Sequence, residues 1–245
     1  MEIIPVIDLK GGIVVHARMG QRERYRPIQT PLARTSDPVD VVGGIMSIYP
    51  FATFYIADLD AIESKGNNHA TIAQVKQAFP QVTLWLDNGI ADVDAATNWL
   101  QQGLGHLVLG SETQADTSVV YRFTKDPRFV LSLDFREAKF QGPSTLLTQT
   151  DYWPQRVIVM TLDRVGSQSG PDMARLRVIR AATEARAIYA AGGVSDARDL
   201  RALANAGIAG ALVASSLHNG RITTADIQDL RSPIEKGATY GGSLL

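Results

Sequence analysis

The chain has 245 residues, a formal net charge of −1 and no cysteine. That length can bury a full hydrophobic core, either as two small domains or as one large α/β barrel. The balanced charge argues against a polyanion-binding surface, so we expect no nucleic-acid partner. The lack of cysteine excludes disulfides, thiolate metal sites and a cysteine nucleophile.

Targeting and membrane segments are also not expected. The first predicted strand already begins at Ile3, which leaves no room for a signal peptide. No uninterrupted apolar run approaches the roughly 20 residues of a membrane helix. We therefore expect a soluble cytoplasmic protein that has no membrane partner.

Eight short runs rich in apolar and β-branched residues recur along the chain. None of them alternates cleanly with polar residues, which is typical of parallel strands buried on both faces. Segments with helical spacing lie between most of them, as in "DVDAATNWLQQG" (92–103) and "DARDLRALANAG" (196–207), each with an early Asp and a closing Gly. The predicted strands are 2–8, 52–58, 82–87, 106–110, 129–134, 156–161, 186–191 and 209–214.

The two halves of the chain follow the same pattern. Gly89 and Gly193 lie 104 residues apart, and so do Asp92 and Asp196, Gly103 and Gly207, Ser111 and Ser215, and Gly66 and Gly170. Asp8 and Asp134 break this offset, which indicates extra chain after the first strand, within 16–37. We predict half-barrels at about 1–125 and 126–230 and a flexible tail at 232–245.

Two matching sets of four strand–helix units predict one closed (β/α)₈ barrel over 1–245. A doubly wound open sheet is the competing interpretation, but it has no reason to repeat its halves at equal length.

Four segments carry a family resemblance: "IIPVIDLKGGIVVHA" (3–17), "SGPDMARL" (169–176), "AAGGVSDARDL" (190–200) and "ALVASSLHNGRIT" (211–223). They resemble the histidine-biosynthesis barrels, namely phosphoribosylformimino-AICAR-phosphate (ProFAR) isomerase and, less closely, the imidazole-glycerol-phosphate synthase cyclase. The resemblance implies a half-barrel duplication and a ligand with two phosphates at opposite sides of the mouth. It also implies acid–base catalysis of an aminoaldose-to-aminoketose (Amadori) rearrangement without a cofactor.

Asp8 and Asp134 end the first and fifth predicted strands, on opposite sides of the barrel mouth. Two carboxyl groups across a partly dry cavity can differ in pKa, one acting as acid and one as base. The resemblance supports this catalytic role at both positions. The alternative is that both carboxylates only cap loop amides.

A phosphate site is predicted after the seventh and eighth strands. Glycines allow close backbone approach, and amides at a helix start bind anions. The loops after these two strands are the usual phosphate site of a (β/α)₈ barrel. The predicted contacts are Gly192, Gly193, Ser195, Ser215 and Ser216.

The equivalent site in the first half is altered. Gly89 and Ser111 keep their places, but Asp87 and Glu112 stand beside them. Each carboxylate would repel a phosphate dianion by about 1 kcal/mol even when well solvated. We therefore expect one intact phosphate site and one altered site.

The segment after the sixth strand departs from the isomerase pattern. Met160 takes the place of a Thr, and Val165 takes the place of an Asp that the family uses in catalysis. A one-residue slip of the alignment would restore Thr161, so Thr161 and Gly166 stay candidate binding residues.

The long loop after the first strand is basic, "ARMGQRERYR" (17–26). It is either a solvated surface loop or a lid that brings Arg18, Arg22 or Arg24 to an anionic ligand. The four histidines lack ligand spacing, so no metal is expected.

Three functions remain open at this point. The chain is a diverged isomerase acting on a small phosphorylated metabolite, a genuine ProFAR isomerase, or a non-catalytic subunit that binds such a ligand. Related barrels occur in organisms that make methanopterin-type one-carbon cofactors, which suggests that metabolism as a context. Of the three, we favour the diverged isomerase. The oligomeric state is left open.

Overall fold

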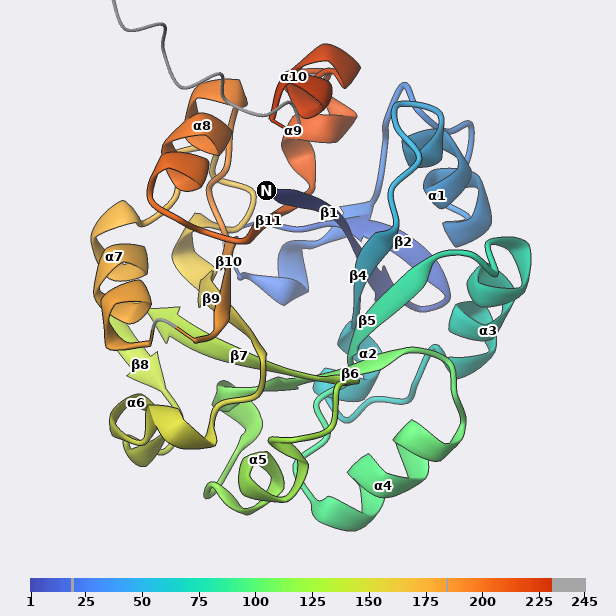
Figure 1. Cartoon of the computed structure of the whole chain (residues 1–245). Helices are drawn as coiled ribbons and strands as arrows, with labels where there is room; N and C mark the ends of the chain where they lie inside the picture. The colour runs from blue at the N-terminus through green and yellow to red at the C-terminus, as the bar shows by residue number, and fades with distance from the viewer. Residues whose placement is uncertain (19, 184, 231–245) are drawn as a thin grey trace, which may run out of the picture.

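The computed structural model describes residues 1–18, 20–183 and 185–230. Within them, eight parallel strands follow one another around a ring, and the last pairs with the first to close it (Figure 1). The (β/α)₈ barrel is therefore confirmed and the open sheet is excluded. The tail predicted at 232–245 lies outside the described residues. In ring order the strands are β1 (Glu2–Lys10), β4 (Thr53–Asp58), β5 (Thr83–Asp87), β6 (His106–Gly110), β7 (Phe129–Arg136), β9 (Arg156–Thr161), β10 (Ala187–Ala191) and β11 (Gly210–Val213).

Helices surround the ring of strands (Figure 1). They are α1 (Pro38–Met46), α2 (Leu59–Ile62), α3 (His69–Ala78), α4 (Val93–Gln101), α5 (Ser118–Phe123), α6 (Thr145–Thr148), α7 (Met173–Ala182), α8 (Ala197–Asn205), α9 (Ser215–His218) and α10 (Thr224–Asp229). Single 3₁₀ turns are η1 (Arg22–Arg24), η2 (Ser111–Thr113), η3 (Thr150–Tyr152) and η4 (Leu162–Arg164).

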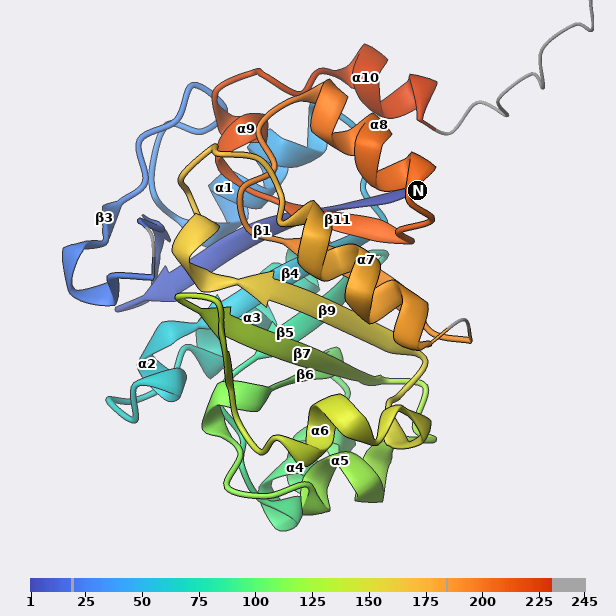
Figure 2. The same cartoon turned by 90° about the vertical axis from the view of Figure 1, so that its left-hand side faces the viewer.

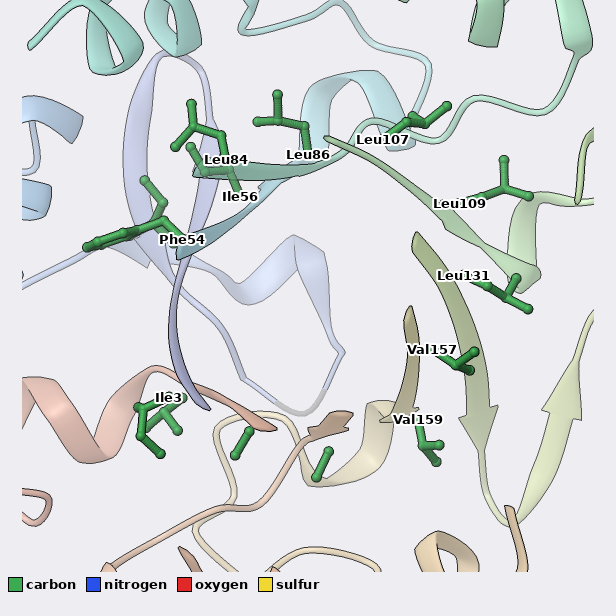
Figure 3. Packing of buried hydrophobic residues seen from close by; sticks show 14 of the residues in the cluster. Ile3, Phe54, Ile56, Leu84, Leu86, Leu107, Leu109, Leu131, Val157 and Val159 are labelled. Carbon is green, nitrogen blue, oxygen red and sulfur yellow. The ribbon is translucent and has the colours of Figure 1, made fainter. Parts of the chain in front are cut away.

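Successive side chains along a strand face the helices and the barrel interior in turn. Figure 3 shows Phe54, Ile56, Leu84 and Leu86 pointing away from the middle of the barrel, where they join the main hydrophobic core. Tyr55 and Trp85, between them in sequence, belong to a second cluster inside the barrel. Burial on both faces explains why the strands read as unbroken apolar runs.

The two helices singled out in the sequence begin and end as expected. Asp92 and Asp196 are the N-caps of α4 and α8, each accepting backbone N–H bonds from the first turn. Gly103 and Gly207 follow the helix ends with φ of +69° and +71°, a conformation that glycine adopts without strain. Both helices bury the apolar face that their spacing predicts.

Three further strands were not predicted: β2 (Ile13–His16), β3 (Arg26–Pro27) and β8 (Lys139–Gln141). β1 and β7 run two residues past Asp8 and Asp134, and each turns back into an antiparallel hairpin with β2 or β8. The two hairpins share one register, since Asp8 pairs with Val15 and Asp134 pairs with Gln141, seven residues on in both cases. The half-barrel duplication remains a prediction that this shared register supports.

All eight barrel strands run in the same direction. Figure 2 shows β1 and β9 running toward the side where β3 and α2 project beyond the barrel, and the other six strands are parallel to them. The carboxyl ends of the strands and the loops that follow them therefore meet at this end, which is where active sites of (β/α)₈ barrels lie.

Candidate active site

A cavity of about 430 Å³ opens among the carboxyl ends of the strands. Its size is typical of a site for a small molecule. It is lined by inward-facing side chains of the strands, by the loops that follow them, and by residues between β2 and α1. Asp8 and Asp134 both line it, and they come from β1 and β7, which lie four strands apart around the ring. The structure thus brings the two predicted acids to opposite walls of one cavity.

Asp134 is held firmly in place. The Ser132 hydroxyl donates to one carboxylate oxygen at 2.6 Å, and the Glu112 amide donates to the other at 3.1 Å. The Ser111 hydroxyl also lies 3.4 Å from the second oxygen, and it accepts the Asp134 amide at 2.9 Å. Burial raises the pKa of Asp134 to about 7, although the bond from Ser132 opposes the shift.

Asp8 makes no side-chain hydrogen bond to any described residue, although it lines the cavity. Burial raises the pKa of its carboxyl group to about 7, and the charge of Arg22 only partly offsets this effect. A carboxyl group with a pKa near neutrality and no internal partner can exchange a proton with a bound molecule.

Asp87 is a third acid in the cavity. The Tyr55 hydroxyl donates to its carboxylate at 2.9 Å, and burial raises the pKa of Asp87 to about 6. Burial and the neighbouring charge of Asp87 raise the pKa of Tyr55 well above its usual value. A Cβ atom on Gly110 would contact the carboxylates of both Asp87 and Asp134, so these two groups converge at the same point. Sequence reasoning missed Tyr55, although its inward position follows from alternation along β4.

The long loop after β2 reaches into the cavity through Arg22. The Arg22 guanidinium donates to Glu112 at 2.5 Å, and both side chains are about three-quarters buried. Of the three arginines named as lid candidates, Arg22 lines the cavity, whereas Arg18 and Arg24 are exposed and lie outside it. The prediction of Arg18 as the contact therefore needs correction, because the turn at η1 directs Arg22 inward.

Gly192, Gly193, Ser215 and Gly166 line the side of the cavity formed by β9, β10 and β11. The two glycines at 192 and 193 also have a packing role. With φ of +97° and +88°, a Cβ atom on them would lie 2.4 Å from the Thr161 carbonyl oxygen and 2.2 Å from that of Gly170. The double glycine is therefore required by the fold of this loop, whether or not a phosphate binds there.

Two histidines lie beside these loops. His16 Nε2 is 3.4 Å from the Ser215 hydroxyl, and His218 Nδ1 is 3.0 Å from the Thr30 hydroxyl. Burial lowers the pKa of both rings, that of His218 to about 4, which favours the neutral imidazole form. Neutral imidazoles can donate hydrogen bonds to a phosphate.

Other predicted phosphate contacts lie outside the cavity lining. The Ser195 amide and hydroxyl both donate to Asp199, which satisfies them at the start of α8. Ser216 is fully buried and donates to the Val194 carbonyl. The hydrogen bonds of these two side chains lie within the loops, and neither side chain lines the cavity.

In the first half, Ser111 is fully buried and donates to the Gln141 carbonyl at 2.7 Å. Gly89 has a φ of +67°, and a Cβ atom on it would lie 2.8 Å from the Cα atom of Ile62. Neither residue lines the cavity. Asp87 and Glu112 line it instead. This position agrees with the prediction that carboxylates alter the phosphate site of the first half.

The segment from β9 to η4 contributes apolar lining. Met160 and Val165 face the cavity, whereas Thr161 is buried on the opposite side of β9, where its hydroxyl accepts from Arg175 at 3.4 Å. Contrary to its prediction as a binding residue, Thr161 therefore does not face the cavity, because alternation along the strand turns Met160 inward. Val165, at the place where the resemblance implies an Asp, gives the cavity an apolar side chain.

In the described part of the chain, no group of three or more His, Asp or Glu side chains is arranged to hold a metal ion. None of the described helices combines the length and apolar character needed to cross a membrane.

Comparison with known proteins places this barrel in a family. The model of the family described as "Histidine biosynthesis protein" matches residues 2–223. The chain belongs to the histidine-biosynthesis protein family. The resemblance inferred from the sequence motifs is thereby confirmed.

Individual relatives of this family member are distant. An uncharacterized protein of Methanocaldococcus jannaschii is 28% identical over 230 residues, covering 93% of this chain and 97% of the relative. The 1-(5-phosphoribosyl)-5-((5-phosphoribosylamino)methylideneamino) imidazole-4-carboxamide isomerase of Lactiplantibacillus plantarum, a ProFAR isomerase, is 27% identical over 240 residues, covering 92% and 97%. Phosphoribosyl isomerase A of Streptomyces coelicolor is 26% identical over 251 residues, covering 95% and 99%. Each of these three alignments covers more than nine-tenths of both chains.

Proposed function

We propose that this member of the histidine-biosynthesis protein family is an isomerase that acts on a small phosphorylated compound by acid–base catalysis. The observation that carries the proposal is the pair of Asp8 and Asp134 on opposite walls of one cavity, both with a pKa of about 7. Groups with a pKa near the working pH are the most effective proton donors and acceptors.

The surroundings of the two acids suggest separate roles. Asp134 accepts hydrogen bonds from the Ser132 hydroxyl and the Glu112 amide, and such bonds favour the ionised carboxylate. We assign to it the removal of the C2 proton in an aldose-to-ketose or Amadori-type rearrangement. Asp8 lacks such donors, so its protonated form is favoured, and we assign to it proton donation to the ring oxygen.

The phosphate is proposed to bind at Gly192, Gly193, Gly166 and Ser215. These residues line the side of the cavity that β9, β10 and β11 form. Glycine backbone and a hydroxyl group at a loop-to-helix junction are typical phosphate ligands. The two nearby histidines can add hydrogen bonds.

A test of the proposal is deuterium exchange at C2 of phosphorylated aldoses and aminoaldoses, ProFAR among them, incubated with the protein in D₂O. We expect Asp8→Asn and Asp134→Asn to lower exchange and turnover by about 100-fold or more while the compound still binds. Asp163→Asn is the matched control, because its carboxylate lies outside the cavity lining and accepts the Glu137 amide at 2.5 Å. Full activity of Asp8→Asn would refute the acid–base assignment.

A genuine ProFAR isomerase is the second candidate, favoured by the names of the distant relatives. Two residues that line the cavity argue against it. Val165 stands where the resemblance implies a catalytic Asp, and Glu112 places a carboxylate beside the predicted second phosphate site. We expect that the gene does not rescue a bacterial strain lacking this isomerase, and clean rescue would establish the second candidate. Binding of a phosphorylated compound without any exchange or turnover would instead indicate a non-catalytic subunit.

A further inference from the structure

The cavity has two chemically different sides. Its acidic side is formed by β1, β5, η2 and β7, which contribute Asp8, Asp87, Glu112 and Asp134. The other side, from β9, β10 and β11, contributes glycines, a serine and apolar side chains. One half-ring of strands therefore carries all the carboxyl groups that line the described cavity.

The acidic side has more carboxyl groups than basic partners. Arg22 is the sole Arg or Lys among the described residues that line the cavity, and Glu112 engages it in an ion pair at 2.5 Å. Asp87 and Asp134 rely on neutral hydroxyl and amide donors, and the Asp8 carboxyl faces the cavity without a hydrogen-bond partner among the described residues. Buried carboxyl groups without cationic partners are costly, so a bound group that supplies positive charge would be stabilised there.

An anionic group at the same place would be disfavoured. It would have to displace Glu112 from Arg22 and lie beside carboxyl groups that already converge near Gly110. This side of the cavity is therefore unsuited to a second phosphate.

We infer that the ligand carries a single phosphate, bound by the loops after β10 and β11, and a protonated amine at its other end, bound by Asp87 and Glu112. The inference rests on the proposed function for the position of the phosphate. It identifies the substrate class as phosphorylated amines, in place of bisphosphates.

The test compares ω-aminoalkyl phosphates of two to six carbons with alkyl phosphates of the same lengths, by calorimetry on the full chain. We expect the amine to tighten binding about tenfold or more at the chain length that spans the cavity, as a charge-assisted hydrogen bond does. In Asp87→Asn and Glu112→Gln this gain should shrink to about threefold or less, while the affinity for the alkyl phosphate holds or rises.

The outcomes separate this inference from the proposed function. If alkyl phosphates bind but the amine gives no gain at any length, the amine site is refuted and the phosphate site stands. If inorganic phosphate and alkyl phosphates fail to bind at all, the phosphate site of the proposed function is refuted, and the inference with it. A gain that persists unchanged in both variants would show that the amine binds elsewhere, which also overturns the inference.

Discussion

Three aspartates of one cavity are held in three different ways. Hydrogen-bond donors fix Asp134, a tyrosine hydroxyl binds Asp87, and Asp8 faces the cavity without such a partner. Burial raises the pKa of all three, and hydrogen bonds to Asp134 and Asp87 oppose the rise. Residues of one type can therefore differ in their chemistry because their neighbours differ.

The two hairpin turns differ in backbone strain. Gly11 and Gly12 form the β1–β2 turn with positive φ, whereas Glu137 and Ala138 form the β7–β8 turn with φ of +48° and +61°. Two-residue hairpin turns of this kind favour glycine, so the second turn is strained.

We expect Ala138→Gly to raise the free energy of unfolding by about 1 kcal/mol, because it relieves the strain of a positive φ at an exposed residue. Gly11→Ala is the matched control and should lower that free energy by a similar amount, since no atom approaches its Cβ position. Urea denaturation measures both. A destabilised Ala138→Gly would contradict the argument.

At the scale of the elements, the loop between β10 and α8 depends on contacts of its backbone. Gly193 packs against the Gly170 carbonyl, and the Arg164 guanidinium holds the carbonyls of Gly170 and Pro171 at 2.9 Å. The loops after β9 and β10 therefore form one unit.

We expect Gly193→Ala to lower the free energy of unfolding by about 3 kcal/mol or more, even without a ligand, because the new Cβ would overlap the Gly170 carbonyl. Gly103→Ala also has a positive φ but open space, and it should cost only about 1 kcal/mol. If urea denaturation gave the same loss of unfolding free energy for both variants, the close packing of Gly193 against the Gly170 carbonyl would not contribute to stability. Because Gly193→Ala is expected to destabilise the fold itself, Ser215→Ala is the cleaner probe of phosphate binding.

For the whole molecule, the acidic cavity makes stability depend on pH. The pKa values of Asp8, Asp134 and Asp87 lie at about 7, 7 and 6 in the folded protein, above the ordinary 3.8. The stabilisation by their protonated forms is complete below about pH 4 and is lost as the pH rises through 6 to 7.

We therefore expect the Asp8→Asn variant to lose less stability than the original protein between pH 5 and pH 8, by about 1–3 kcal/mol. Urea denaturation at the two pH values gives this difference. Both proteins carry the same histidines, so the contributions of His16 and His218 cancel. An identical pH dependence in the two proteins would indicate that Asp8 is ionised at neutral pH.

Much of this architecture could be predicted from local patterns. The eight barrel strands were located to within two residues at each end, because unbroken apolar runs and capped amphipathic helices leave few alternatives. The Gly11–Gly12 pair is typical of a two-residue hairpin turn and could have predicted the β1–β2 hairpin. The β7–β8 hairpin had none, since its turn is built from Glu137 and Ala138, which do not favour that conformation.

The sequence alone determined the barrel, its family and the presence of acids at its working end, since these follow from periodicity and motifs along the chain. Only the tertiary structure decided that Arg22 pairs with Glu112, that Met160 and not Thr161 faces the cavity, and that Ser195 and Ser111 make hydrogen bonds within loops. The physical reason is that a side chain's partner depends on loops brought together by closure of the barrel, which separation along the chain does not encode.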